Sequence, residues 1–284
     1  MRTLCDIYKF VIVLLGVSDC GFGLGYHKDV GIKQAEHLMQ QETSRIIGGQ
    51  QVPSIMIYPY HAGIVATLTS GWTSICGGTL VSNTRVVTAA HCWWDGQSQA
   101  RTFTIVLGSL KIFSGGTRLA TSDIVVHPSW NTKDIVNDIA VVKISRVQFN
   151  NNIQAIPLPA MSDVNNIFAG VTAIATGFGK MSDAQTGFPQ TTQLHHVTLK
   201  VLTNAVCQRS FSDVAIHGSH LCTDGANRVG TCEGDSGGPL TAVVNNKRTL
   251  IGIVSFGLGD SCQAGTPSVY TRVTAFLTWI NAQL

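Results

Sequence analysis

One stretch of the chain, residues 232–240, reads Cys-Glu-Gly-Asp-Ser-Gly-Gly-Pro-Leu. The hydroxyl of Ser236 is a poor nucleophile at neutral pH unless a neighbouring base takes its proton. Its attack also needs backbone N–H donors that are positioned to stabilise the oxyanion that forms. The glycines at positions 234, 237 and 238 allow backbone conformations that residues with a side chain resist. The stretch therefore predicts a tight turn that pushes Ser236 outward and points the N–H groups of Gly234 and Ser236 at one spot. An ordinary Gly-rich surface turn is the alternative for Gly-Asp-Ser-Gly alone.

Two further motifs supply the partners that such a serine needs. Residues 87–92 read Val-Thr-Ala-Ala-His-Cys, which places His91 after an apolar β-branched run. Residues 137–142 read Asn-Asp-Ile-Ala-Val-Val, which places Asp138 at the head of another such run. A lone histidine or aspartate is more often structural, but three motifs in the order His, Asp, Ser are hard to obtain by chance. The three together predict nucleophilic catalysis.

These motifs resemble those of the chymotrypsin/trypsin family of serine proteases, and the chain is closest in character to its insect-type chymotrypsin-like members. The resemblance runs from Ile-Ile-Gly-Gly at residues 46–49 to the chain end. It implies that Ser236 is the nucleophile, that His91 is the general base and then acid, and that Asp138 orients and stabilises the imidazolium. It also implies an oxyanion hole made by the N–H groups of Gly234 and Ser236. A secreted binding protein that keeps the fold without turnover is the alternative, and the intact triad argues against it.

The length and composition favour a β-rich, loop-rich secreted protein with one or two domains. The chain has 284 residues, of which 29 are glycine and only 12% are charged. A formal net charge of +3 is too weak and too scattered to indicate a nucleic-acid partner. His195 and His196 are adjacent, so on a strand they face opposite sides and cannot easily chelate a metal. We expect neither a metal nor a cofactor.

The start of the chain reads as a leader. A basic opening is followed by an apolar run over residues 10–17 and then by small residues. This pattern predicts a signal peptide over residues 1–23, with its end between Cys20 and Gly23, and the run is too short to span a bilayer. A buried strand of the mature fold is the alternative. Residues 24–45 read as an activation propeptide, and residues 46–284 as the protease domain.

The bond between Arg45 and Ile46 has the form of an activation site for a trypsin-like protease. In the family that the chain resembles, the cut frees the α-amino group of Ile46, which folds inward to pair with the acid beside the nucleophile, here Asp235. Losing one partner of such a buried pair costs about 3–5 kcal/mol, enough to hold a soft oxyanion loop in its active shape. A turn-stabilising role is the alternative for Asp235.

The pattern of the remaining chain predicts an all-β fold. β-branched runs with polar breaks form two groups of about six strands. We expect two packed six-stranded antiparallel β-barrels, the first over about residues 46–155 and the second over about 165–270. Apolar residues at helical spacing predict a C-terminal α-helix over about 273–284. The site then lies between the barrels, with His91 and Asp138 from the first and Ser236 from the second.

Cysteine spacing indicates an oxidising compartment. Cys5 and Cys20 lie in the leader, and six cysteines remain, whose spacing alone leaves many pairings open. The family resemblance selects three pairs: Cys76–Cys92, Cys207–Cys222 and Cys232–Cys262. A reduced cytosolic protein would not be expected to keep such bridges.

The resemblance also places the specificity pocket. Its floor falls at Gly230, beside Thr231, and at Ser268, and its wall falls at Ser255, Phe256 and Gly257, along which the substrate adds as a strand. Trypsin-like members carry an aspartate at the position of Gly230, whereas this floor is uncharged. We expect chymotrypsin-like cleavage after Phe, Tyr, Leu or Met. An elastase-like or broader specificity is the alternative, and Asp260 could admit some basic residues.

These features together predict a secreted, extracellular monomer that acts on protein and peptide substrates. Protein protease inhibitors are further possible partners, and neither nucleic acid nor a membrane is expected. A digestive role fits the short propeptide, while venom, salivary and immune roles stay open.

Overall fold

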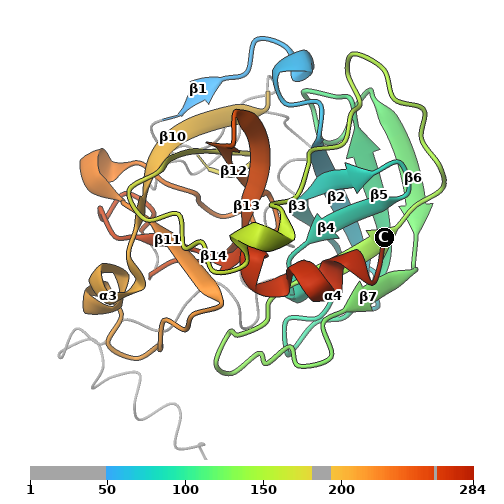
Figure 1. Ribbon diagram of the computed structural model, residues 1–284. Coiled ribbons are helices and arrows are strands. Elements are labelled where there is room, and N and C mark those ends of the chain that lie inside the picture. Colours follow the sequence, from blue (N-terminus) through green and yellow to red (C-terminus); the bar gives the residue numbers. More distant parts are fainter. Residues whose placement is uncertain (1–48, 181–192, 259–260) are drawn as a thin grey trace, which may run out of the picture.

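The computed structural model describes residues 49–180, 193–258 and 261–284. The expected signal peptide and propeptide, the activation residues Arg45 and Ile46, and Asp260 lie outside the described residues. The described chain is built from two antiparallel sheets that lie side by side (Figure 1). The candidate site residues come from both of them.

The first sheet has the strand order β6-β5-β2-β3-β4-β8-β7. Its strands are β2 (His61–Leu68), β3 (Thr73–Ser82), β4 (Arg85–Thr88), β5 (Ala100–Leu107), β6 (Thr117–Thr121), β7 (Ile124–Val126) and β8 (Ala140–Lys143). Strands β6 and β7 are separated by only two residues, yet they pair at opposite ends of the sheet, β6 with β5 and β7 with β8. The N–H of Lys143 donates to the carbonyl of Asp123 at this bend (2.9 Å). The sheet therefore curls on itself as a half-barrel.

The second sheet closes into a barrel. Its strands are β1 (Gln50–Gln51), β9 (Thr172–Gly177), β10 (His195–Leu202), β11 (His220–Thr223), β12 (Pro239–Val244), β13 (Lys247–Phe256) and β14 (Ser268–Arg272). Strand β10 pairs with both β11 and β9, so six strands form a closed ring. The prediction of an all-β fold with two barrel-like halves is confirmed.

Strand β1 departs from the expected division of the chain. The sequence boundaries place residues 50–51 with the first barrel, but β1 pairs with β10 of the second. The N–H of Val52 extends this edge by donating to the carbonyl of Leu194 (2.7 Å). These backbone bonds carry the start of the described chain across to the second barrel.

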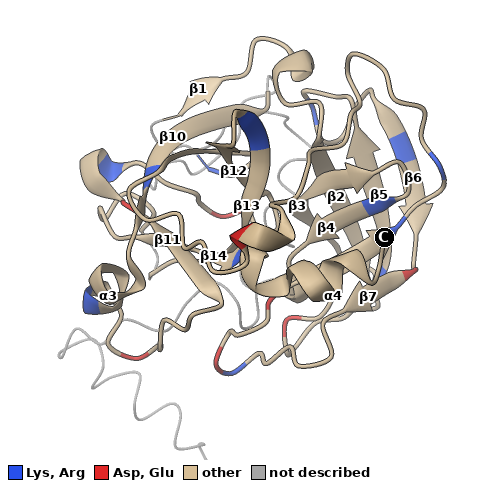
Figure 2. Cartoon of the chain, in the orientation of Figure 1, with Lys and Arg blue, Asp and Glu red and all other residues tan. Residues whose placement is uncertain are grey.

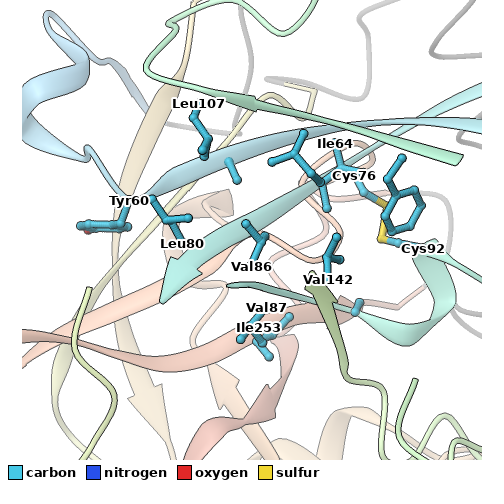
Figure 3. Packing of buried hydrophobic residues seen from close by; sticks show 14 of the residues in the cluster. Tyr60, Ile64, Cys76, Leu80, Val86, Val87, Cys92, Leu107, Val142 and Ile253 are labelled. Carbon is cyan, nitrogen blue, oxygen red and sulfur yellow. A yellow bond between two sulfur atoms is a disulfide. The ribbon is translucent and has the colours of Figure 1, made fainter. Parts of the chain in front are cut away.

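The cores follow from the alternation of the strands. In β10, Val197, Leu199 and Val201 are buried while Thr198 and Lys200 are exposed, because successive side chains of a strand face opposite sides. Burial of each such aliphatic side chain contributes about 1.5–3 kcal/mol. Figure 3 shows part of the largest core cluster, where aliphatic side chains of the first sheet pack near the Cys76–Cys92 disulfide and Ile253 of β13 joins them from the second sheet.

The helices are short. They are α3 (Asn204–Cys207), α4 (Leu277–Asn281) and the 3-10 turns η2 (Ile55–Ile57), η3 (Ala90–Cys92), η4 (Met161–Asp163), η5 (Gln208–Ser210), η6 (Ala226–Arg228) and η7 (Val273–Phe276). The expected C-terminal helix is present, but its first turn is η7 and only α4 is α-helical. Phe276, Leu277 and Ile280 bury their side chains in the core of the first sheet. Within the described ranges, no helix combines the length and apolarity needed to cross a bilayer.

Charged side chains are sparse on both halves of the molecule. Figure 2 shows lysine and arginine scattered over both sheets, with the few acidic residues between them. Two ion pairs between lysine and an acid occur in the described residues, Lys143 with Asp123 and Lys180 with Glu233. The second of these pairs lies next to the turn that carries Ser236.

Candidate active site

The register of two strands brings His91 and Asp138 together. Thr88 at the end of β4 pairs with Ala140 at the start of β8. His91 follows β4 in the turn η3, and Asp138 precedes β8 by two residues. The N–H of His91 donates to Oδ1 of Asp138 (2.9 Å), and Nδ1 of the ring lies 2.7 Å from Oδ2. Both side chains are buried, with exposed fractions of 0% and 1%.

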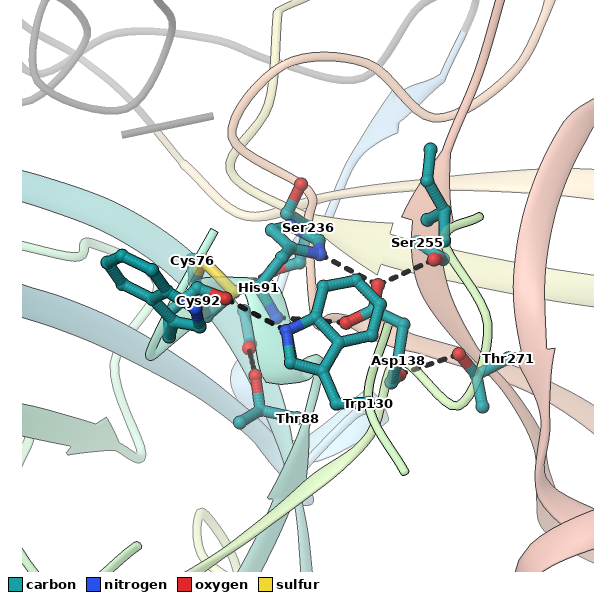
Figure 4. Close-up of polar contacts among 12 residues, drawn as sticks. Cys76, Thr88, His91, Cys92, Trp130, Asp138, Ser236, Ser255 and Thr271 are labelled. Carbon is teal, nitrogen blue, oxygen red and sulfur yellow. Dashed lines mark hydrogen bonds and ion pairs between the residues drawn. A yellow bond between two sulfur atoms is a disulfide. The ribbon is translucent and has the colours of Figure 1, made fainter. Parts of the chain in front are cut away.

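Asp138 collects hydrogen bonds from both barrels. The hydroxyl of Ser255 donates to Oδ2 (2.6 Å), and the hydroxyl of Thr271 donates to the backbone carbonyl of Asp138 (2.6 Å). Burial alone raises the pKa of Asp138, but the charge of His91 and the hydrogen bonds from His91 and Ser255 outweigh it and lower that pKa below its ordinary value. The carboxylate is therefore ionised at neutral pH and holds the imidazole in one orientation (Figure 4).

The turn that carries Ser236 is tied to the residues around His91. Gly234 and Gly237 have φ angles of 94° and 79°, which favour glycine. The carbonyl of Ser236 accepts from the N–H of Gly77 (2.7 Å), and Sγ of Cys92 lies 3.7 Å from it. Because Cys92 directly follows His91, these contacts place the serine beside the histidine, as Figure 4 shows.

The same turn leaves two backbone donors available. The N–H of Asp235 donates to the carbonyl of Cys232 (3.0 Å), whereas those of Gly234 and Ser236 make no hydrogen bond within the described part of the chain. The carbonyl of Glu233 accepts from the N–H of Lys180 (3.0 Å). In a planar trans peptide the following N–H points the opposite way, so the N–H of Gly234 faces away from Lys180. The side chains of Lys180 and Glu233 also form an ion pair.

Asp235 lies fully buried in a cradle of glycines. Its Oδ1 accepts from the N–H of Gly179 (2.7 Å), and its Oδ2 accepts from the N–H of Cys232 (2.9 Å). A Cβ atom added to Gly177 would lie 2.0 Å from this carboxylate, and one added to Gly179 would lie 2.4 Å from it. The acid is thus held by backbone that only glycine can bring so close. Its expected partner Ile46 lies outside the described residues.

The described residues contain three disulfides, and they are the pairs that the family resemblance implies: Cys76–Cys92, Cys207–Cys222 and Cys232–Cys262. The first joins β3 to the turn that carries His91. The sulfurs of Cys76 and Cys92 also lie within 4.8 Å of a ring nitrogen of His91. Because they are bonded to one another, they offer no thiolate to a metal.

A cavity of about 20 Å³ lies beside Ser236. Its lining consists of Thr231, Cys232, Glu233, Ser236 and residues 254–257. The expected wall residues Ser255, Phe256 and Gly257 are among these, whereas Gly230 and Ser268 are not. Ser268 is buried next to Thr231, whose N–H donates to its Oγ (3.3 Å). A cavity of this size holds about one water molecule, so it is smaller than the slot expected for an aromatic side chain.

Other residues of the site were not identified from the sequence. The side chain of Ser255 was expected in the pocket wall, but its hydroxyl reaches Asp138 across a separation of 117 residues. Thr271, whose hydroxyl reaches the backbone carbonyl of Asp138, also belongs to the site (Figure 4). The indole N–H of Trp130, drawn in the same figure, donates to the carbonyl of Trp94 (3.0 Å). No local signal marks these contacts, because each joins strands or loops that meet only in the fold.

Comparisons with known proteins agree with this geometry. The model of the Trypsin family matches residues 46–280. A collagenase of Hypoderma lineatum is 32% identical over 260 residues, covering 92% of this chain and 95% of its own length. Chymotrypsin-C of Bos taurus is 31% identical over 280 residues, covering 95% and 99%. The solved structure of a protein named HL collagenase superposes with a TM-score of 0.76 at 33% identity, covering 84% of this chain and 98% of that one.

The alignments to these relatives, by sequence and by structure, cover most of this chain. The match includes both sheets, all three disulfides and the segments that carry His91, Asp138 and Ser236. The chain belongs to the trypsin family of serine proteases.

Proposed function

We propose that the protein is a secreted endopeptidase that cleaves peptide bonds through an acyl-enzyme formed on Ser236. The observation that carries this proposal is the buried pair of His91 and Asp138 beside the Ser236 turn, with Ser255 donating to the same carboxylate. Because Asp138 holds Nδ1 of the imidazole, the opposite nitrogen, Nε2, is the one available as a base.

In the first half of the reaction, Oγ of Ser236 attacks the scissile carbonyl carbon while its proton passes to Nε2 of His91. The negative charge that develops on the carbonyl oxygen is received by the N–H groups of Gly234 and Ser236. His91 then gives the proton to the leaving amine as the C–N bond breaks. In the second half, His91 takes a proton from water, which attacks the carbonyl carbon of the ester on Ser236. His91 then returns that proton to Oγ of Ser236 as the C–O bond breaks, which releases the acid and restores the enzyme.

We also propose that the enzyme is made as a zymogen and is activated by cleavage after Arg45 by a trypsin-like protease. Support comes from Asp235, whose carboxylate is fully buried next to the nucleophile and accepts two backbone N–H groups. A buried carboxylate is stable only where charge or hydrogen bonds compensate it. Secretion is supported by three disulfides, which persist in oxidising compartments, and by the leader-like start of the chain.

For the substrate, we propose cleavage after uncharged residues, with large apolar side chains preferred once the cavity beside Ser236 opens to admit them. The lining that the cavity presents is neutral except for Glu233, whose carboxylate is paired with Lys180. A lysine or arginine entering it would find no free buried carboxylate there and would lose its hydration without compensation. Because one relative is named collagenase, collagen belongs among the protein substrates to be tested.

Two measurements test the proposal. A sulfonyl fluoride probe should label the activated protein stoichiometrically, and Ser236→Ala should abolish the labelling; an unlabelled, correctly folded protein would indicate the silent binding homologue instead. The kcat/KM values of matched Phe and Arg peptide amides should favour Phe. A preference for Arg by about tenfold or more would contradict the neutral pocket.

A further inference from the structure

A second hollow, which we call the Arg146 groove, lies on the first sheet. Its volume is about 430 Å³, and its lining consists of Asn83, Arg146, Val147, Gln148 and Phe149. Ligand sites in proteins commonly enclose about 300–1,000 Å³, so the groove has room for a ligand of the size of an amino-acid residue. It is much larger than the cavity beside Ser236, and the catalytic steps proposed above use none of its residues.

The groove lies at the far end of β4 and β8 from the catalytic pair. Asn83 precedes β4 by two residues and Arg146 follows β8 by three, whereas His91 and Asp138 adjoin the other ends of these strands. The N–H of Val147 donates to the carbonyl of Asn83 (2.9 Å), which ties the two sides of the groove together. At about 3.3 Å per residue, the paired strands separate the groove from the catalytic pair by roughly 10 Å. A ligand in the groove is therefore held apart from the catalytic residues.

Arg146 is the group in the groove that suits an anion. In the amide orientation that satisfies both side chains, the oxygen of Asn83 accepts from Nε and Nη2 of Arg146 (3.1 Å each). This contact fixes the plane of the guanidinium along one side and leaves the end-on pair of N–H groups, one on each terminal nitrogen. Such a pair matches the two oxygens of a carboxylate. No acid in the described part of the chain pairs with Arg146.

The surroundings of Arg146 carry an excess of positive charge. Arg85 and Lys143 lie directly opposite one another on β4 and β8, so their side chains leave the same face of the sheet. Nε of Arg85 donates to the carbonyl of Gln283 (2.6 Å), so backbone rather than an acid holds this cation. Lys143 pairs with the exposed Asp123 (3.5 Å). Three cations and one acid thus lie at this end of the two strands, which favours an anionic ligand.

The rest of the lining favours an apolar body attached to that anion. Phe149 leaves 47% of its surface exposed, which is unusual for an aromatic side chain, and Val147 beside it is largely buried. The exposed Gln148 brings an amide that both donates and accepts hydrogen bonds. A fixed guanidinium, an aromatic face and an amide are complementary to a carboxylate, an apolar side chain and a peptide group.

We propose that the Arg146 groove binds the C-terminal residue of a peptide, with the free carboxylate on Arg146 and a large apolar side chain on Phe149. That such peptides are the enzyme's own products rests on the proposed function, because cleavage after a large apolar residue leaves this end on one of the two products. An uncut substrate has an amide in place of the carboxylate. The groove therefore distinguishes product from substrate at a place separate from the catalytic residues.

The test measures binding to protein whose Ser236 has been blocked with phenylmethanesulfonyl fluoride, so that the cavity beside Ser236 is filled. Titration calorimetry compares N-acetylphenylalanine as the free acid with its carboxamide. The acid should bind about tenfold or more tightly than the amide, because only a carboxylate takes both N–H groups of Arg146. Arg146→Gln should remove this preference, and Arg146→Lys, which keeps the charge without the paired donors, should restore only part of it. Phe149→Ala should weaken binding of the acid about fivefold.

Arg101→Gln serves as the matched control, because Arg101 is an exposed arginine of β5 outside the groove. It should bind the acid as the wild type does. Equal affinities for acid and amide, or an unchanged affinity for the acid in Arg146→Gln, would overturn the proposal. Hexanoate bound as tightly as N-acetylphenylalanine would do the same, since the groove would then bind any apolar carboxylate. A wild type that the sulfonyl fluoride does not label would overturn the proposed function instead, and titration of the unblocked chain and its Arg146→Gln variant would still decide the groove.

Discussion

His61 offers a quantitative test of the packing between the two barrels. It is the first residue of β2, and its ring is buried with an exposed fraction of 2%. Nδ1 lies 2.9 Å from the hydroxyl of Thr176 in β9, and the ring meets Phe178 edge to face at 5.3 Å. Its Nε2 has no hydrogen-bond partner among the residues that the structure describes. Burial lowers the pKa of His61 from 6.5 to about 3.

This shift predicts a loss of stability in acid. The folded-state pKa lies below the unfolded value, so between pH 6.5 and about 3 the unfolded chain binds a proton that the folded chain does not. The free energy of unfolding therefore falls as the pH drops through this window. Each unit costs about 1.4 kcal/mol, so about two units below 6.5 the contribution of His61 alone reaches roughly 3 kcal/mol.

The measurement uses the mature chain with Ser236→Ala, which prevents self-digestion. Urea unfolding at about pH 7.5 and about pH 4.5 gives the acid loss, with and without His61→Gln. The glutamine variant should be less stable at the higher pH but should lose roughly 3 kcal/mol less on acidification. An equal acid loss with and without His61 would refute the reasoning.

Three further predictions concern the proposed mechanism. Ser236→Ala and His91→Ala should each lower kcat by about six orders of magnitude, and the double variant should lose little more, since the residues act as a unit; additive losses would contradict this. Ser255→Ala removes one hydrogen bond to a buried carboxylate, so kcat should fall about tenfold with little change in KM, as steady-state kinetics would report. Arg45→Gln should block activation by trypsin, whereas the wild-type precursor should gain activity together with a new N-terminus at Ile46. Full activity in uncut precursor would rule out the zymogen.

The sequence predicts the elements of the candidate site well because each of them is local. The glycines next to Ser236 in the sequence indicate the turn that carries it. His91 and Asp138 each lie next to the strand that positions them. The register of β4 on β8, which no local pattern encodes, then brings His91 and Asp138 together. The all-β class follows from β-branched runs for the same reason, since the alternation of a strand is visible within a few residues.

Other features of the site depend on contacts between distant segments. The hydroxyls of Ser255 and Thr271 reach Asp138 from strands of the second barrel, and the glycines that cradle Asp235 lie more than fifty residues before it. The left-handed conformation of Ile135 is equally invisible in the sequence, because isoleucine carries no signal for it and the ring of His220, whose Nε2 lies 3.0 Å from its carbonyl, is 85 residues away. The size of the cavity depends on how these segments pack, which explains why a larger one was expected.

Ser268 provides the last test, which concerns the depth of the specificity pocket. Its Oγ accepts from the N–H of Thr231 (3.3 Å), and a Cβ atom added to Gly230 would lie 2.9 Å from it. The hydroxyl therefore lies against the backbone of residues 230–231, behind the lining of the cavity. Ser268→Gly removes it and leaves room into which a longer side chain can extend.

The variant should shift the preference from Leu toward Phe. Ser268→Gly removes a Cβ and a hydroxyl. Space for even one more methylene in an apolar pocket is worth about 1–3 kcal/mol, so the ratio of kcat/KM for Phe over the shorter Leu amides should rise by about tenfold or more. The comparison uses peptide amides that differ only in the cleaved residue, with enzyme concentrations set by active-site titration. Thr231→Ser, which changes the lining but keeps the N–H that Ser268 accepts, separates depth from width and should move the ratio less. An unchanged Phe to Leu ratio in Ser268→Gly would show that the depth of the pocket is set elsewhere.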